Sequence, residues 1–266
     1  MQNYPPPTGG QSYPPPGSPY GAPPPPAPPK KSKTPWIIAG VGCVLIVGVI
    51  IIVALVGGLA IIGNKMKSTQ TQNAPAATQP AGTKQYVNTR AGRTGDLAKN
   101  YVDFSFYYPD NWVEDTDPAP NYVRVERKLE DADEGNFTQE NFAVGWVSGT
   151  GTALDKQLLP KLAEQFNEQF STQFPNYRKL SEGETKVGAY EGYEFKFTAK
   201  KEDTPKGDIT LYGRVVALPP PAGQTRGVAF VMLATNLAPE IHSADDVGVK
   251  GQMPVILNTF RFGSTK

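Results

Sequence analysis

His242, the only histidine of the chain, has a serine and an aspartate close to it in the sequence. Ser243 follows it directly, and Asp245 comes two residues later. A serine nucleophile needs a base within hydrogen-bond reach and a carboxylate that orients the base, so these residue types would suit acyl transfer. Triad residues converge from different elements, whereas these three share one short segment. We therefore expect a turn or helix cap here, and no catalytic residue.

Acidic side chains gather at residues 130–134 and are followed by Asn136. Carboxylate and amide oxygens at alternate positions are how a calcium-binding loop begins. Gly135 occupies the position of the third oxygen donor of an EF-hand, so the pattern breaks there. We expect a solvated loop between two strands, without a metal, and we expect no cofactor elsewhere in the chain.

Six aromatic side chains exceed the number that strand alternation alone would bury. Tyrosine and tryptophan are good anchors at interfaces. We predict that they contribute to a surface for a ligand or a protein partner, with packing in the core as the alternative. The residues are Tyr107, Trp112, Tyr122, Trp146, Tyr190 and Tyr193. The segment 219–227, which begins with three prolines, is either a rim of such a groove or a plain connection.

Short runs of alternating apolar and polar residues predict antiparallel strands after residue 100. One amphipathic helix, in which Pro160 causes a kink or begins the regular part, is predicted by apolar residues at every fourth position: Leu154, Leu158, Leu162, Phe166 and Phe170. A last helix is expected at residues 252–258. The predicted strands are residues 101–108, 122–127, 142–147, 178–185, 189–199, 209–218 and 228–235.

This order of elements predicts an antiparallel sheet covered by helices, which is α+β in class. Several residues add to the pattern: the FSFYYP segment at 104–109, Trp112, the Gly192-Tyr193-Glu194 strand, the strand at 228–234 and Thr259-Phe260. Together they resemble the PsbP-like domains of photosystem subunits and bacterial envelope proteins, over about residues 100–262. The resemblance implies an α/β/α sandwich that acts as a binding or assembly module, without a shared catalytic or metal-binding set.

A stretch from Trp36 to Ile62 contains no charged residue. As a helix it would be about 40 Å long, more than the roughly 30 Å hydrocarbon core of a bilayer. A signal peptide would have a shorter apolar core nearer the start of the chain. We therefore predict a single-pass transmembrane helix at residues 36–63.

The predicted span divides the rest of the chain into regions of different composition. Residues 1–35 form a proline- and tyrosine-rich tail that cannot pack a core, and residues 64–95 form a flexible stalk. Residues 96–266 form the folded domain. Three lysines precede the span and two follow it closely, so the positive-inside rule places the tail in the cytoplasm and the domain outside the cell membrane.

Charge is unevenly distributed along the chain. Residues 1–84 hold six lysines and no acid, which leaves 20 of the 26 basic residues against all 25 acids in the remainder. A mildly acidic domain does not suit nucleic acid, which calls for clustered lysine and arginine. We expect a non-enzymatic, membrane-anchored envelope protein whose domain binds a protein partner or a small ligand. The alternatives are a cell-envelope enzyme of unrecognised type, or a scaffold that acts through the proline-rich tail.

Overall fold

The computed structural model describes residues 78–118, 120–129 and 137–263. The predicted tail at 1–35, the predicted transmembrane helix at 36–63 and the acidic run at 130–134 lie outside these residues. Within the described part of the chain, no helix is long and apolar enough to cross a membrane. All the described residues belong to one compact unit.

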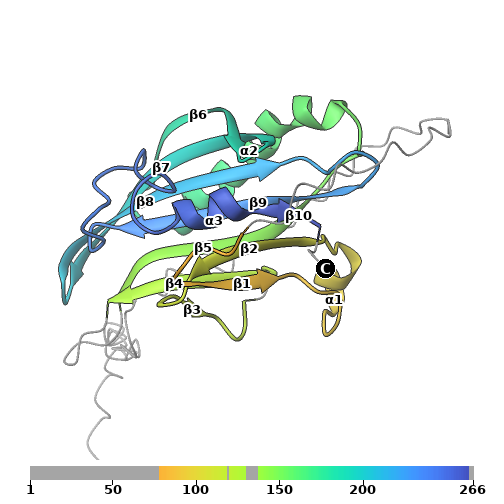
Figure 1. Ribbon diagram of the computed structural model, residues 1–266. Coiled ribbons are helices and arrows are strands. Elements are labelled where there is room, and N and C mark those ends of the chain that lie inside the picture. Colours follow the sequence, from red (N-terminus) through yellow and green to blue (C-terminus); the bar gives the residue numbers. More distant parts are fainter. Residues whose placement is uncertain (1–77, 119, 130–136, 264–266) are drawn as a thin grey trace, which may run out of the picture. The chain divides into compact units, whose positions relative to one another are not determined.

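Two antiparallel sheets dominate the domain (Figure 1). The larger has the strand order β3-β4-β5-β9-β8-β7-β6, and the smaller has the order β1-β2-β10. The strands are β1 (Thr83–Val87), β2 (Phe104–Pro109), β3 (Val113–Glu114), β4 (Val123–Leu129), β5 (Phe137–Ser148), β6 (Arg178–Val187), β7 (Tyr190–Thr204), β8 (Gly207–Leu218), β9 (Arg226–Thr235) and β10 (Arg261–Phe262). The helices are α1 (Gly95–Lys99), α2 (Leu154–Gln173) and α3 (Pro254–Thr259). The predicted α+β class with an antiparallel sheet is confirmed.

Both faces of the larger sheet are buried. On β5, Phe142, Val144 and Trp146 belong to one hydrophobic core, whereas Ala143 and Val147 belong to the other. Successive side chains of a strand point to opposite faces, so a strand covered on both sides must be apolar at nearly every position. The second half of β5 (FAVGWV) and most of β9 (GVAFVMLA) are accordingly apolar at nearly every position.

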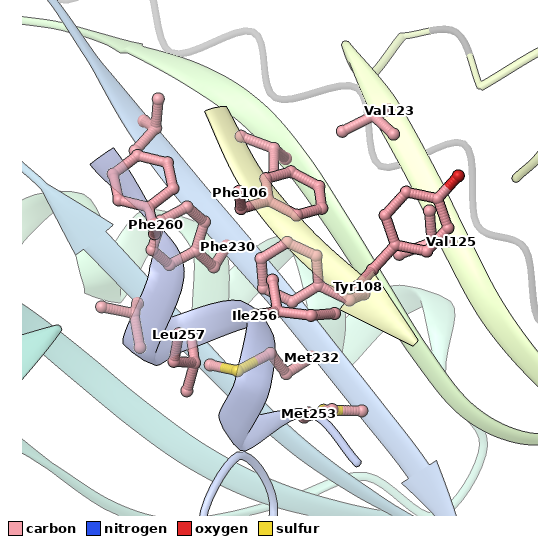
Figure 2. Packing of buried hydrophobic residues seen from close by; sticks show 14 of the residues in the cluster. Phe106, Tyr108, Val123, Val125, Phe230, Met232, Met253, Ile256, Leu257 and Phe260 are labelled. Carbon is pink, nitrogen blue, oxygen red and sulfur yellow. The ribbon is translucent and has the colours of Figure 1, made fainter. Parts of the chain in front are cut away.

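The two faces are covered by different kinds of element. Helix α2 covers one face, with Phe166 and Phe170 in the core beneath it. On the other face, Phe106 of β2 and Ile256 of α3 pack over Phe230 of β9 (Figure 2). The expected cover of helices is thus correct for the first face and incomplete for the second. Strand β2 forms a separate layer there because its alternate aromatic side chains are all buried on one side.

The domain begins before the predicted boundary at residue 96. Strand β1 lies inside the segment 64–95, which we expected to be a flexible stalk, and pairs with β2 along its length. Tyr86 packs against Phe106 at a centroid distance of 5.2 Å, and its hydroxyl donates to the carbonyl oxygen of Tyr122. The prediction was wrong for this part of the stalk because a strand with one buried aromatic residue has no recognisable alternation.

Helix α2 confirms the predicted helix but buries a different stripe of residues. Leu154 is 51% exposed and Leu158 is 37% exposed, whereas Leu159, Leu162 and Phe166 are buried. Four residues of an α-helix turn through about 400°, so a strict repeat of four drifts by about 40° at each step around the axis. The repeat therefore leaves the core face towards the start of the helix, and the first two leucines are left at the surface.

Candidate functional site

Three of the six aromatic residues predicted to form a binding surface are in the core. Trp112 and Tyr122 are each 1% exposed, and Trp146 is 8% exposed. The indole N–H of Trp112 donates to Gln252 Oε1 at 2.6 Å, and the hydroxyl of Tyr122 donates to the carbonyl oxygen of Asn100. Their polar ends are thus satisfied inside the protein, and these three residues cannot contribute to a surface. For them the core alternative is correct.

Tyr190 and Tyr193 line two neighbouring hollows at one end of the larger sheet. Tyr193 lines a hollow of about 280 Å³, and Tyr190 lines a second of about 250 Å³. Lys156 and Glu191 line both. We call the two hollows together the end groove. Tyr107 of β2 is half-buried and lines neither hollow.

The walls of the end groove come from four parts of the chain. Helix α2 contributes Lys156, Leu159 and Pro160, and the β6–β7 hairpin contributes residues 184–186 and 189–193. The connection from β8 to β9 contributes Pro219, Pro220 and Pro221, and β10 contributes Phe262. The segment 219–227 therefore forms a rim, which was one of the two interpretations of its prolines.

Close backbone approach holds the proline-rich connection against the start of α2. Gly151 has a positive φ of 73°, and a Cβ there would lie 2.3 Å from the carbonyl oxygen of Gln224. The backbone N–H of Gly149 donates to the carbonyl oxygen of Thr225 at 3.0 Å. Glycine adopts this left-handed conformation readily because it has no Cβ, and the absence of a Cβ also allows the close approach to Gln224. The rim of the groove is thus tied to the helix that forms its wall.

Asp155 fixes the loop that leads into α2. Its buried carboxylate accepts the backbone N–H groups of Thr150 and Gly151, each at 2.7 Å, and the hydroxyl of Thr150 at 2.8 Å. An acidic residue in the first turn also interacts favourably with the helix dipole. The groove is consequently built on a preorganised frame.

An exposed ion pair lines both hollows. Lys156 contacts Glu191, and Lys186 lies 3.9 Å from the same carboxylate. Hydrogen bonding and charge from Lys156 hold the pKa of Glu191 below its usual range. Both side chains of the Lys156–Glu191 pair are more than half exposed, and exposed pairs contribute little to stability. A partner can therefore separate this pair and satisfy either charge at small cost.

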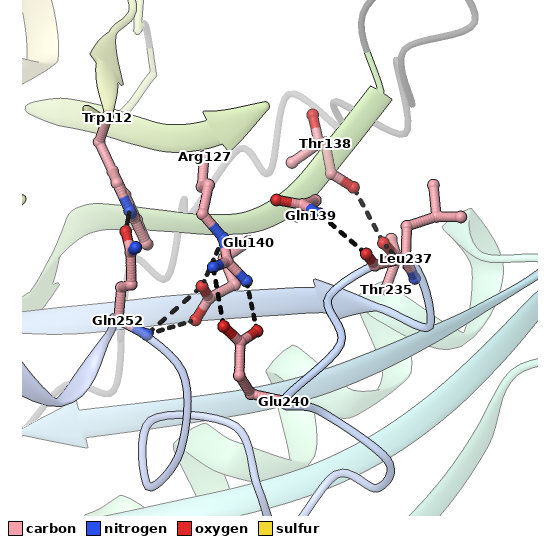
Figure 3. A network of polar contacts seen from close by, with 9 residues as sticks. All are labelled: Trp112, Arg127, Thr138, Gln139, Glu140, Thr235, Leu237, Glu240 and Gln252. Carbon is pink, nitrogen blue, oxygen red and sulfur yellow. Dashed lines mark hydrogen bonds and ion pairs between the residues drawn. The ribbon is translucent and has the colours of Figure 1, made fainter. Parts of the chain in front are cut away.

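A second polar cluster lies near the other end of the sheet, with Arg127 and Glu140 buried and Glu240 partly exposed (Figure 3). Arg127 Nε lies 2.9 Å from Glu140 Oε2, and Arg127 Nη2 lies 2.8 Å from Glu240 Oε2. Glu140 has no exposed surface and also accepts the backbone N–H of Gln252 at 3.2 Å. Burial raises the pKa of Glu140, and the charge of Arg127 opposes this rise. The cluster clamps the segment before α3 onto β4 and β5, which is a structural role.

The segment around His242 forms a turn in the loop before α3, and the expected helix cap is not formed, since α3 begins after Met253 without a side-chain cap. The carboxylate of Asp246 accepts the backbone N–H groups of His242 at 2.9 Å and Ser243 at 3.0 Å. Asp245 instead contacts Lys196, at 2.8 Å. The carboxylate that holds this turn is therefore that of Asp246, which was not among the residues considered for catalysis.

Acidification is expected to weaken the domain through Asp246. Hydrogen bonds from Lys250 and from the backbone of His242 lower the pKa of Asp246 from 3.8 to about 2. A carboxyl whose pKa is lower in the folded state stabilises that state above its unfolded pKa. This contribution is lost as the pH falls from about 4 to about 2. In urea unfolding of the full chain at several pH values, Asp246→Asn should lower stability at pH 7 and flatten its fall below pH 4. An unchanged acid slope would contradict this role.

Comparisons with known proteins identify no family. No family model matches the chain, and no curated protein is detectably similar in sequence. Among solved structures, the cyanobacterial PsbP protein of Synechocystis sp. PCC 6803 has a TM-score of 0.40 and 12% identity, and the match covers 72% of this chain and 98% of that chain. Protein PA94 of Pseudomonas aeruginosa, which is of unknown function, has a TM-score of 0.27 and 12% identity, with 50% and 78% covered. At these scores the likenesses assign neither a family nor a function.

Proposed function

We propose that this chain is a non-enzymatic, membrane-anchored envelope protein whose α+β domain binds a protein partner through the end groove. The observation that carries the proposal is the groove itself, in which aromatic, proline and leucine side chains surround the separable Lys156–Glu191 pair. Leu154 and Leu158 are the exposed leucines of α2, and Leu158 lines a third, smaller hollow with Leu159, Pro219 and Pro220. An exposed apolar border around a few polar groups is the usual composition of a protein-binding surface.

The size of the groove favours a protein segment over a small molecule. Its two hollows have volumes of about 280 and 250 Å³. Sites that enclose a small ligand usually have about 300–1,000 Å³. Each hollow instead has room for one or two side chains of a partner. The Lys156–Glu191 pair between the hollows would then contact the partner's backbone that connects those side chains.

The position of the groove suits a protein that is tethered at its start. Thr83, where the chain enters β1, pairs with Pro109 at the end of β2. Phe262, which lines the groove, pairs with Phe104 at the opposite end of β2. If residues 36–63 span the membrane, the groove lies at the end of the domain away from the tether, where a partner has access.

Replacing Leu154 by aspartate is expected to weaken capture of the partner by at least about tenfold, which corresponds to 1.4 kcal/mol. The carboxylate would be placed beside the groove, yet an acid in the first turn of a helix favours folding, so the variant should remain folded. The assay is a quantitative pull-down from detergent-solubilised native membranes with the full chain as bait. Val249→Asp is the matched control, because Val249 is 62% exposed on the loop before α3.

Two outcomes would contradict the proposal. One is equal capture by Leu154→Asp, Val249→Asp and the unaltered chain. The other is capture that is lost only when residues 1–35 are deleted, which would favour a scaffold that acts through the tail.

A further inference from the structure

Three arginines come together over the aromatic residues Tyr101 and Tyr122 and the side chain of Asn100. Arg90 and Arg93 belong to the loop between β1 and α1, and Arg226 begins β9. The guanidinium carbon of Arg90 lies 4.6 Å from the centre of the Tyr101 ring, and that of Arg93 lies 5.8 Å from the centre of the Tyr122 ring. The tyrosines thus form an aromatic floor under two of the cations.

The hydrogen bonds of these arginines go to neutral oxygen atoms. Arg93 Nη2 donates to the hydroxyl of Tyr86 at 2.6 Å and to Asn88 Oδ1 at 2.9 Å. Arg226 Nε donates to Asn100 Oδ1 at 2.7 Å, and its Nη1 donates to its neighbour's carbonyl oxygen. Among residues 78–118, 120–129 and 137–263, no carboxylate forms an ion pair with any of the three. Arginines elsewhere in the domain, such as Arg127 and Arg214, do have such partners.

The three cations form a row with Arg93 in the middle. Burial raises the pKa of Tyr101 and that of Tyr122, and Arg93 opposes the rise at both. The hydroxyl of Tyr101, whose ring lies under Arg90, donates to the carbonyl oxygen of Asn88 at 2.8 Å. The hydroxyl of Tyr122, whose ring lies under Arg93, donates to the carbonyl oxygen of Asn100. Hydrogen bonds agree with this order, since Arg93 contacts Asn88 and Arg226 contacts Asn100.

Few acids stand near the row. Asp103 lies close enough to Tyr101 to raise its pKa further. Asp96 of α1 is within 3.7 Å of Lys99, which offsets its charge. The surface around the row therefore keeps an excess of positive charge, although the domain as a whole is acidic.

We propose that Arg90, Arg93 and Arg226 form a docking site for an acidic segment of a protein, which supplies several carboxylates in succession. Guanidinium groups bind carboxylates through two parallel hydrogen bonds, and an aromatic floor holds them in place. The guanidinium group of Arg90 makes no hydrogen bond within the described residues, so its five donors are available. This site goes beyond the end groove and does not depend on it.

Distribution of the charge favours an extended acidic segment over a single phosphate. A phosphate site draws several donors to one point, often with backbone N–H groups of a helix start. Here the cations are spread along two tyrosine rings, and two of them already spend donors on neutral oxygens. Each arginine thus has one or a few donors free for a separate carboxylate.

The test is binding of a fluorescein-labelled peptide of ten glutamates to the full chain, followed by fluorescence anisotropy at low ionic strength. Arg90→Gln and Arg226→Gln should each weaken binding by about three- to tenfold, and the double variant should weaken it further. Added salt should weaken binding to the unaltered chain, because the cations are partly exposed. Arg178→Gln, which removes an exposed arginine of β6 outside the row, should bind like the unaltered chain.

Arg90→Gln is the decisive variant because the exposed Arg90 side chain makes no hydrogen bond within the described residues and the backbone bond from Arg93 is kept, so the variant is expected to remain folded. The proposal is overturned if Arg90→Gln and Arg226→Gln bind as tightly as the unaltered chain, or if Arg178→Gln weakens binding equally. It is also overturned if inorganic phosphate displaces the peptide at a concentration similar to the Kd of the peptide. That result would define a phosphate site.

Discussion

Replacing Glu140 by alanine lowers the free energy of unfolding by about 3–5 kcal/mol, the expected cost of removing one partner of a buried ion pair. The change leaves Arg127, which has only 9% of its side chain exposed, with Glu240 as its remaining acid. It also leaves the backbone N–H of Gln252 without its acceptor.

The measurement is urea unfolding of the full chain at pH 7, followed by tryptophan fluorescence. Trp112 is a natural reporter, since its indole N–H bonds to the side chain of Gln252. Glu240→Ala is the matched control: its side chain is 43% exposed, so we expect a loss of no more than about 1 kcal/mol. Equal losses for the two variants would show that burial does not distinguish the two ion pairs.

Replacing Phe170 by alanine should cost about 3–5 kcal/mol, the usual range for a buried phenylalanine. Phe170 has no exposed surface and contacts the rings of Phe174 and Phe197 at centroid distances of 5.6 and 5.4 Å. Leu154→Ala, sixteen residues earlier in the same predicted apolar repeat, should change stability by less than about 0.5 kcal/mol. Thermal and urea unfolding of both variants checks the contrast, and a similar loss for Leu154→Ala would mean that the first turn of α2 is also core.

This contrast shows how far the sequence could predict the helix. Apolar residues at every fourth position correctly indicated the position of α2. They did not indicate its buried face, because the repeat drifts around the axis and only packing against β7 decides where it faces the core. The exposed Leu154 and Leu158 were read as core residues.

Strands were predictable where alternation was long enough, and most of the larger sheet followed from it. β1, α1, β3 and β10 were not predicted, since each has only two to five residues and gains its stability from neighbours. The division into two sheets also escaped prediction. The sequence of β2 predicts a strand with one buried face. It does not show that this face packs against α3 and β9 from a second sheet, because a strand within the larger sheet would have the same pattern.

The candidate site was predictable only in part. Tyr190 and Tyr193 were among the expected surface residues, and the prolines at 219–221 were recognised as a possible rim. The contribution of α2 was missed because Lys156 and Glu191 are 35 positions apart, and no local pattern connects them. The arginine row was missed for the same reason. Its members come from the loop after β1 and from the start of β9, which are far apart in the sequence, and only the fold shows that no acid among the described residues pairs with them.

Photo-cross-linking tests the central claim, that the end groove is the surface at which this domain meets its partner. Benzoylphenylalanine would replace Leu158 or Ala189 beside the groove, and Val113 or Val249 away from it, in the full chain expressed in its native cells. We predict one discrete cross-linked product at Leu158 and at Ala189, and none at Val113 or Val249. Products at Val113 or Val249 alone, or none at the groove positions, would contradict it.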